Sequence, residues 1–310
     1  LDGRGLAPAF LSAALDVPAA GTCFVDVALG GQALSWPEVD ALAARHSPRV
    51  RAHHDVSDIT NLYANADASV GPGGVALLEK LCLGLPTLAV IVAENQRASV
   101  EGLVSLGCVA SVDAAVGDDT DAVFETRVRV ALEELLTSET NLHDMWRHGA
   151  ALIDGLGARR IVLAARPESN RDGAPVTLRQ FTADDSALLL AWQSEPGMRK
   201  YFRDPEVPGT VDHQAWCAAR LTDPFGVCEM VVVDDRPVGM MRFDPTPDAG
   251  FDGPGEVSVL LSGSEQGRGT GTAALMALRR LLREREMRAE IHPDNQASWG
   301  SFRRAGFVPL

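Results

Sequence analysis

A glycine-rich segment near the C-terminal end constrains the fold of this 310-residue chain more than any other part of its sequence. The apolar residues 257–261 have the composition of a buried strand, and a short polar connector joins them to Gln-Gly-Arg-Gly-Thr-Gly at 266–271. Leucines then recur at helical spacing through 272–286, which predicts a helix. A glycine loop between a strand and a helix N-terminus favours anion binding, because its amides point outward and the helix dipole attracts negative charge.

Two common nucleotide-binding motifs do not fit this loop. A dinucleotide fingerprint needs G-x-G-x-x-G and an acidic residue about 20 residues further on. Gly267, Gly269 and Gly271 are spaced one residue too closely for it. A Walker A loop needs Gly-Lys followed by Ser or Thr, which the chain lacks. The loop does match Gln/Arg-x-x-Gly-x-Gly/Ala, with Gln266 in the first position.

This loop resembles the acetyl-CoA loop of the GNAT acetyltransferases. Further on, Asn295, Ser298, Phe302 and the pair Gly306-Phe307 resemble the Asn-x-x-Ala/Ser-x-x-x-Tyr-x-x-x-Gly-Phe ending of that family. The resemblance implies a GNAT α+β domain with a mixed sheet, which uses acetyl-CoA as its cofactor.

The resemblance also implies which residues contact the cofactor. In GNAT domains the strand before the loop splays away from its neighbour and its backbone holds the pantetheine arm. The loop amides hold the pyrophosphate, and the family's asparagine borders the cofactor. The residues expected to bind acetyl-CoA are therefore Val259, Leu260, Gln266, Gly267, Arg268, Gly269, Thr270, Gly271, Asn295 and Ser298.

Acetyl transfer to an amine needs a well-placed thioester, a base that takes a proton from the ammonium group, and a proton for the leaving thiolate. By resemblance, two carboxylates are candidate bases: Glu290 and Glu256, which opens the splayed strand. His292 is a weaker third candidate. The family's usual acid is a tyrosine at the position of Phe302, and a phenyl ring cannot protonate a thiolate. Water or Tyr201 would then supply the proton, or the domain is impaired.

The first half of the chain alternates between strand and helix patterns, which predicts a parallel sheet with helices on both faces. Residues 1–20 show no clear period. Strands are expected over 23–29, 68–70, 88–92 and 109–112, and helices over 36–45, 59–65, 75–83, 100–106 and 122–136.

A possible nucleotide-sugar site lies within this half. Gly73 and Gly74 open a helix, which suits a diphosphate. Glu79 follows one turn and a half along that helix, where it can accept hydrogen bonds from ribose hydroxyls. Asn95 and Gln96 are expected on the loop after the next strand, where they can bind phosphate or sugar hydroxyls.

This pattern resembles the C-terminal, donor-binding half of GT-B nucleotide-sugar enzymes. Over roughly residues 23–163 it is similar to the UDP-2,4-diacetamido-2,4,6-trideoxy-β-L-altropyranose hydrolases of pseudaminic acid biosynthesis, through Ala-Glu-Asn-Gln at 93–96 and the segment 154–160. The resemblance implies a Rossmann-like half-domain that binds a UDP-sugar. The hydrolases carry a Gly-x-Gly-His catalytic motif in their other half. No histidine of this chain lies in such a motif, so we expect poor hydrolysis.

In the second half the expected order is strand, two helices and three strands before the glycine loop. A polar segment rich in Pro and Gly separates the two patterns and is interpreted as a linker. The predicted fold class is α/β, with three parts: a GT-B-like nucleotide-sugar-binding domain over 1–164 that lacks the N-terminal half of the family's cleft, a linker over 165–175, and the GNAT domain over 176–310.

Composition excludes several classes of partner and site. A net charge of −14 disfavours nucleic acid and anionic membranes, because both attract basic surfaces. No apolar run reaches the roughly 18 residues of a membrane span. The five scattered cysteines predict neither a metal site nor a disulfide framework, and without a signal peptide a cytoplasmic location is expected. The chain starts without Met, and both ends are expected to be cut from a longer protein.

The two resemblances point to one pathway, in which a GNAT enzyme acetylates the 4-amino group of a UDP-linked amino sugar directly before the hydrolase acts. Our leading hypothesis is therefore an acetyl-CoA-dependent N-acetyltransferase for a UDP-linked amino sugar, fused to a UDP-sugar hydrolase-type domain. Two alternatives stay open. The chain is a catalytically silent module that binds nucleotide sugar and CoA, or its GT-B-like half is a piece of a glycosyltransferase and its GNAT domain acetylates a protein or peptide amine.

Overall fold

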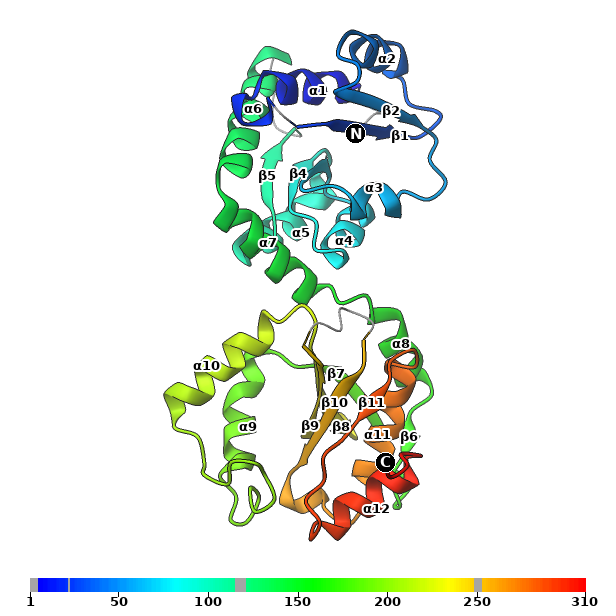
Figure 1. Cartoon of the computed structure of the whole chain (residues 1–310), viewed down its shortest axis with the longest axis vertical. Coiled ribbons are helices and arrows are strands. Elements are labelled where there is room, and N and C mark those ends of the chain that lie inside the picture. The colour runs from blue at the N-terminus through cyan, green and yellow to red at the C-terminus, as the bar shows by residue number, and fades with distance from the viewer. Residues whose placement is uncertain (1–4, 22, 115–120, 248–252) are drawn as a thin grey trace. The chain divides into compact units, whose positions relative to one another are not determined.

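The computed structural model describes residues 5–21, 23–114, 121–247 and 253–310. Its internal contacts divide the chain into two compact units, Leu1–Ile153 and Asp154–Leu310. Figure 1 shows helices and strands in both units, so the predicted α/β class is confirmed.

Parallel strands form the sheets of the N-terminal unit. β3 (Ser69–Pro72), β4 (Thr87–Ile91) and β5 (Ala110–Asp113) make a three-stranded sheet with β4 in the middle. β1 (Val25–Leu29) and β2 (Val50–His54) pair separately, also in parallel. All five residues of β4 are buried, as expected for a parallel strand that is covered on both faces.

The side chains of β4 alternate between two cores. Leu88 and Val90 pack against residues of α1 and α6. Ala89 and Ile91 pack against residues of α4 and α5, so helices cover both faces. The helices of this unit are α1 (Ala7–Asp16), α2 (Trp36–Arg45), α3 (Thr60–Ala64), α4 (Val75–Cys82), α5 (Glu94–Ser105), α6 (Asp121–Thr137) and α7 (Glu139–Leu152), with a 3-10 turn η2 (Pro18–Ala20).

A six-stranded mixed sheet forms the centre of the C-terminal unit, in the order β11-β10-β9-β8-β7-β6. Every neighbouring pair is antiparallel except β10 and β11, which run in parallel. The strands are β6 (Glu168–Ser169), β7 (Pro175–Gln180), β8 (Val227–Val233), β9 (Arg236–Pro245), β10 (Gly255–Leu261) and β11 (Met287–Arg288).

Helices pack on both faces of this sheet as well. One core joins α11 with residues of α8 and α12, and a second core joins α9 and α10 to the opposite face. The bounds of these elements are α8 (Gly157–Ala165), α9 (Ser186–Gln193), α10 (Thr210–Leu221), α11 (Thr270–Leu281) and α12 (Gln296–Arg304), with 3-10 turns η3 (Ala183–Asp185) and η4 (Gly263–Glu265).

The segment interpreted as a linker, residues 165–175, belongs to the C-terminal sheet. β6 pairs with β7, and the side-chain oxygen of Asn170 accepts hydrogen bonds from the amides of Asp172 and Ala174, both at 3.0 Å. The polar, glycine-containing composition therefore serves a tight hairpin. α8 also packs with this unit, which places the division of the chain at Ile153, upstream of the expected boundary at residue 164.

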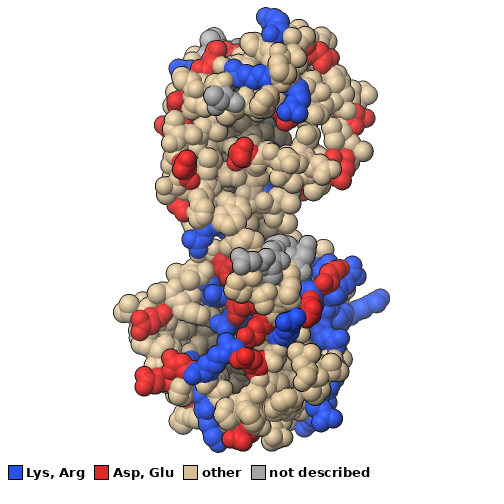
Figure 2. All heavy atoms as spheres, in the orientation of Figure 1, with Lys and Arg blue, Asp and Glu red and all other residues tan. Residues whose placement is uncertain are grey.

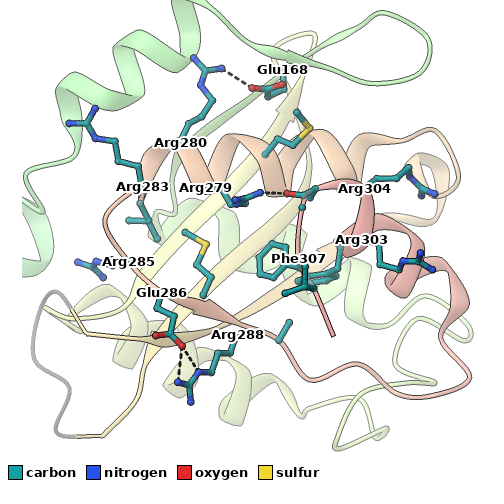
Figure 3. Close-up of a pocket in the computed structure, with 18 of the residues that line it drawn as sticks. Glu168, Arg279, Arg280, Arg283, Arg285, Glu286, Arg288, Arg303, Arg304 and Phe307 are labelled. Atoms are coloured by element: carbon teal, nitrogen blue, oxygen red, sulfur yellow. Dashed lines mark hydrogen bonds and ion pairs between the residues drawn. The ribbon is translucent and has the colours of Figure 1, made fainter. Parts of the chain in front are cut away.

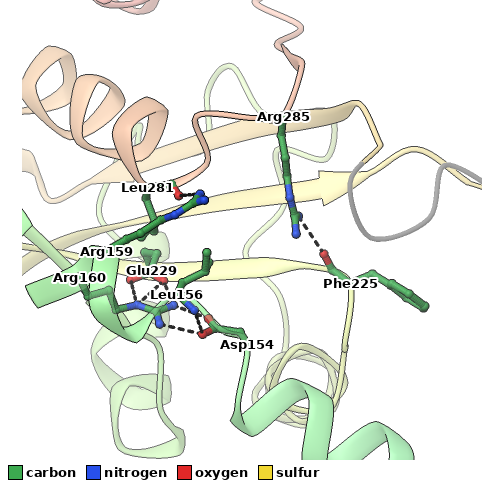
Figure 4. Close-up of polar contacts among 8 residues, drawn as sticks. All are labelled: Asp154, Leu156, Arg159, Arg160, Phe225, Glu229, Leu281 and Arg285. Carbon is green, nitrogen blue, oxygen red and sulfur yellow. Dashed lines mark hydrogen bonds and ion pairs between the residues drawn. The ribbon is translucent and has the colours of Figure 1, made fainter. Parts of the chain in front are cut away.

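A buried ion triad fixes α8 to the sheet (Figure 4). Arg160 donates to Asp154 Oδ1 at 2.9 Å and, through its Nε, to Glu229 Oε1 at 3.0 Å. The side chain of Glu229 is completely buried in β8. Burial raises the pKa of Glu229, and the hydrogen bonds from Arg160 oppose this by favouring the carboxylate.

Arg160→Ala is expected to lower the free energy of unfolding by about 3–5 kcal/mol, because it leaves the Glu229 carboxylate buried without a partner. Arg159→Ala is the matched control: it removes the neighbouring arginine, whose partner Glu284 is half exposed, and it should cost much less. Urea unfolding of both variants measures the difference. Equal losses would contradict the role of the triad.

Candidate active site

The glycine loop of the C-terminal unit takes a conformation that glycine favours. Gly267 has φ of 79° and Gly269, the N-cap of α11, has φ of 85°. In this left-handed region a side chain costs roughly 1–2 kcal/mol per residue. Across the described residues, the backbone amides of 267–271 donate to no protein acceptor. A row of free amides at a helix N-terminus is an anion-binding arrangement.

The β6–β7 hairpin holds this loop in place. The Arg171 amide donates to the Arg268 carbonyl oxygen at 2.9 Å, and Arg171 Nη1 donates to the Gly267 carbonyl oxygen at 3.1 Å. In return, Arg268 Nε donates to Asp172 Oδ2 at 2.7 Å. This role of the hairpin was not predicted from the sequence. The Asp172-Gly173 pair, a common hairpin dipeptide, is the signal that predicts such a turn.

The side chains of Thr270 and Arg268 are both bound to Glu265. Thr270 is fully buried, and its hydroxyl donates to Glu265 Oε2 at 3.0 Å. Arg268 is exposed, and its Nη1 donates to Glu265 Oε1 at 3.2 Å. Thr270 and Arg268, both expected to bind cofactor, have side chains with protein partners and offer a ligand their backbone amides. Gln266, Gly267, Gly269 and Gly271 lie at the loop surface, exposed or half exposed.

The strand before the loop parts from its neighbour. β10 pairs with β11 only through Gly255–Met287 and Glu256–Arg288, whereas its pairing with β9 continues to Leu261. The Gly255 amide donates to the Glu286 carbonyl oxygen, on the β11 side. Past Glu256 the described residues offer β10 no strand partner on that side.

The direction of the free backbone groups follows from the period of two in a strand. The Gly255 amide faces β11, and the Ser262 amide faces β9, where it donates to the Val238 carbonyl oxygen at 2.9 Å. The register between them is uninterrupted. Val259 therefore presents its polar backbone groups to the opening between β10 and β11. Those of Leu260 face β9, and its side chain is buried in the core with α9 and α10.

The C-terminal motif lies on α12. Asn295 is the N-cap of this helix, and its side-chain oxygen accepts from the Ser298 amide at 3.1 Å, which leaves its NH2 group for a ligand. Phe302 is buried and packs edge-on against Phe307, with ring centroids 4.9 Å apart. Phe302 is thus a core residue with no acidic proton.

The two candidate bases meet on one guanidinium. Arg203 Nη2 lies 2.8 Å from both carboxylate oxygens of Glu256 and 2.6 Å from Glu290 Oε2. Hydrogen bonds to Glu256 and Glu290 raise the pKa of Arg203. The rings of Tyr201 and His292, the candidate acid and the third candidate base, lie together with centroids 5.2 Å apart.

In the N-terminal unit, part of the expected nucleotide-sugar site comes together. Gly74 is the N-cap of α4. A Cβ atom added to Gly73 would lie 3.6 Å from the Cβ of Gln96, and one added to Gly74 would lie 3.8 Å from Gln96 Nε2. The carboxyl ends of parallel β3 and β4 produce this proximity. The Gln96 side-chain oxygen accepts from the Val92 amide at 3.1 Å.

The other two residues expected in this site are Asn95 and Glu79. Asn95 and Gln96 lie in the first turn of α5, which begins at Glu94, so the expectation of a loop there was wrong. Their polar sequence suits a first helical turn, where amide donors are free. Asn95 and Glu79 are both exposed.

Lys80 is a buried residue that the sequence analysis did not single out. It is 4% exposed, with its Nζ 3.5 Å from the Val70 carbonyl oxygen and 5.5 Å from the centroid of the Tyr63 ring. A side chain on Gly71 would collide with it. Burial lowers the pKa of Lys80 to about 8.

A cleft of the C-terminal unit lies elsewhere. It measures about 1260 Å³ between α8, α11, α12 and the last residues of the chain, and arginines surround its apolar floor (Figure 3). Arg280 contacts Glu168 at 2.8 Å, and Arg279 donates to the Ala305 carbonyl oxygen. No residue of the glycine loop lines this cleft. This cleft is therefore separate from the glycine loop.

Among the described residues, no group of three or more His, Cys, Asp and Glu side chains is placed to hold a metal ion. None of the helices described has the length and apolar composition needed to cross a membrane. On the face drawn in Figure 2, acidic and basic side chains are interspersed over the C-terminal unit.

Comparison with known proteins identifies the C-terminal unit. Residues 176–308 match the family model described as an acetyltransferase (GNAT) domain. The chain thus carries a C-terminal GNAT acetyltransferase domain, whose mixed sheet is the one described above. The N-terminal part is distantly similar to the spore coat polysaccharide biosynthesis protein SpsG of Bacillus subtilis, with 25% identity over 127 residues. This match covers 40% of the chain and only 36% of the length of SpsG.

Several solved structures are similar. The aminoglycoside acetyltransferase AAC(6')-Ib in complex with coenzyme A shares 23% identity over 44% of this chain and 85% of that one, with a TM-score of 0.39. The GNAT domain of PAT from S. lividans shares 25% over 46% and 86%, with a TM-score of 0.39. RimJ of Mycobacterium smegmatis, in complex with CoA-disulfide, shares 17% over 46% and 73%, with a TM-score of 0.38.

The buried Lys80 should make stability depend on pH. Its folded pKa lies below the ordinary value of 10.5, so the unfolded chain binds more protons between about 8 and 10.5 and stability rises with pH there. Relative to Lys80→Met, the wild type should gain about 2–3 kcal/mol in free energy of unfolding between roughly pH 7 and 10. Urea unfolding of both whole chains across this range measures it, and parallel pH profiles would contradict the burial of a charged amine.

Proposed function

We propose that the C-terminal unit transfers the acetyl group of acetyl-CoA to the amine of a UDP-linked amino sugar, in the biosynthesis of a pseudaminic-acid-like sugar. The N-terminal unit would bind the UDP part of such a sugar, as a piece of a UDP-sugar hydrolase-type domain. One observation carries the first part: a strand with unpaired backbone groups leads directly into a loop of free amides at the start of α11.

These features suit the two polar parts of acetyl-CoA, which itself supplies the reactive thioester. The amides of 267–271 would bind the pyrophosphate, because they sit at the positive end of the helix dipole. Val259 and Leu261 would bond the amides of the pantetheine arm with their free backbone groups, as an added strand does. Asn295 would contribute its side-chain NH2 group.

Glu256, on β10, and Glu290, after β11, are the groups that would accept the proton from the acceptor. Glu256 or Glu290 accepts the proton that the acceptor's ammonium group must lose before its nitrogen attacks the thioester carbon. A C–N bond forms, the C–S bond breaks, and the nitrogen loses its second proton to water as the amide forms. The departing thiolate takes a proton from water or from Tyr201, because Phe302 has none to give.

Two observations support the proposal for the N-terminal unit. Gly73, Gly74 and Gln96 lie close together at the carboxyl ends of parallel strands, where α/β sheets bind ligands. The distant similarity to SpsG, named for spore coat polysaccharide biosynthesis, agrees with a carbohydrate ligand.

A second candidate function is a module that binds both ligands without transferring acetyl. Phe302 favours it, because the position where the family usually has its acid is filled by a buried phenyl ring.

Calorimetric titration tests the cofactor site. Gly271 has an ordinary backbone conformation, and a Cβ there would make van der Waals contact with Leu261 Cδ1 at 3.4 Å and Ser301 Oγ at 3.8 Å, so Gly271→Glu adds charge and bulk to the loop without backbone strain. This variant should weaken acetyl-CoA binding by roughly 10- to 100-fold through lost charged hydrogen bonds, and leave UDP binding unchanged. Gly157→Glu adds the same charge at the start of α8 and should change neither. Equal acetyl-CoA affinity in the wild type and both variants would contradict the proposed cofactor site.

Radiolabelled acetyl-CoA tests the acceptor. We expect label to pass to UDP-linked amino sugars and much more slowly to the same sugars without UDP. Acetyl-CoA binding without any labelled product would leave the silent module. Label on peptide amines alone would show that the acceptor is a protein or peptide.

A further inference from the structure

Arg203 stands out among the cations of the segment between α9 and α10. Arg199 donates to Gln193 Oε1, at the end of α9, at 2.7 Å and to the Asp204 carbonyl oxygen at 2.6 Å. Both contacts are local in the sequence. Lys200 lies over the Tyr201 ring at 4.9 Å. Within the described residues, Arg203 alone of these cations reaches the carboxylates of β10 and of the residues after β11.

The place of this contact matters. Glu256 forms the last residue pair between β10 and β11, so it lies where the two strands part. The backbone of the same strand, from Val259 onward, is the proposed site of the pantetheine arm. A side chain at Glu256 is therefore close to where the proposed cofactor ends and an acceptor amine must arrive.

The two carboxylates are held unequally. Arg203 Nη2 contacts both oxygens of Glu256 at 2.8 Å, and that side chain is 34% exposed on a strand of the central sheet. Glu290 contacts Arg203 through one oxygen and is 77% exposed, after β11 has ended. Of the two, Glu256 is the less exposed and the one held through both oxygens.

We propose that Arg203 is a positioning residue of the acetyl-transfer site, which orients Glu256 as the general base and uses Glu290 as a second anchor. This inference rests on the proposed acetyl transfer. The two contacts from Arg203 Nη2 fix the direction of the Glu256 carboxylate, so the proton of the acceptor ammonium group passes to a preplaced oxygen. It also resolves the choice between two bases that the sequence left open.

A simple surface salt bridge would contribute little, because exposed ion pairs are screened by water and salt. The functional reading makes a different prediction for pairs of variants. Glu256→Gln should lower kcat by at least about 100-fold, the usual share of a general base. Arg203→Met should lower kcat by roughly 10- to 100-fold with the KM for acetyl-CoA unchanged, because the base is misplaced. Arg203→Lys should restore part of that loss.

The double variant is the decisive measurement. If Arg203 acts through Glu256, adding Arg203→Met to Glu256→Gln should change kcat by less than about twofold. Arg283→Met removes an exposed arginine that pairs with Glu284 and with neither candidate base, and this variant should behave like the wild type. Multiplied losses in the double variant, or an Arg203→Met loss that appears only as a lower urea midpoint, would overturn the proposal.

The design separates this inference from the proposed function. Transfer to an amine other than a UDP-linked sugar, with a non-additive double variant, would refute the acceptor and support Arg203. Transfer to a UDP-linked sugar with additive losses would do the reverse. If no amine accepts label, thiol release from acetyl-CoA in water is followed in the same variants. Acetyl-CoA binding without any release would refute both.

Discussion

The parting of β10 from β11 is the constraint on which the C-terminal unit depends. A strand that loses its neighbour leaves amides and carbonyls that need another partner. The last paired stretch includes Gly255, where a Cβ would lie 2.5 Å from the Asp244 carbonyl oxygen and from the Phe243 ring of β9, so only glycine fits at this position. Beyond it, the free edge of the strand runs into the loop of free amides before α11. One geometric feature thus creates both halves of the proposed cofactor site.

Arginines join the segments that surround this feature. Arg160 ties α8 to β8 through a buried carboxylate, and Arg268 ties the glycine loop to the β6–β7 hairpin. Arg203 ties the α9–α10 segment to β10. In a chain with a net charge of −14, guanidinium groups suit this task, because they stay charged and bond two carboxylates at once. Arginine–carboxylate pairs therefore both stabilise the local structure and, in the proposed chemistry, position the base.

Sequence patterns predicted what depends on short-range order. The helix over 36–45 matches α2, and the glycine loop lies at the start of a helix as expected. The sequence patterns did not predict structure that depends on contacts between residues far apart in the chain. Residues 7–16 have no clear period, yet they form α1, with Phe10 packed edge-on against Phe124 at 5.3 Å. The hairpin at 165–175 looked like a linker because turns and linkers share a composition. The meeting of Glu256 and Glu290 on Arg203 joins three distant segments, which no local pattern encodes.

Residue-resolved hydrogen exchange on β10 tests the central claim most directly. If the strand edge and the loop hold acetyl-CoA, adding it should slow exchange at the amides of Val259 and Leu261 and across 267–271. The amides of Ser258 and Leu260, which face β9, should keep their rates. Unchanged exchange at Val259 and Leu261 in the presence of bound acetyl-CoA would show that the cofactor lies elsewhere and would contradict the account.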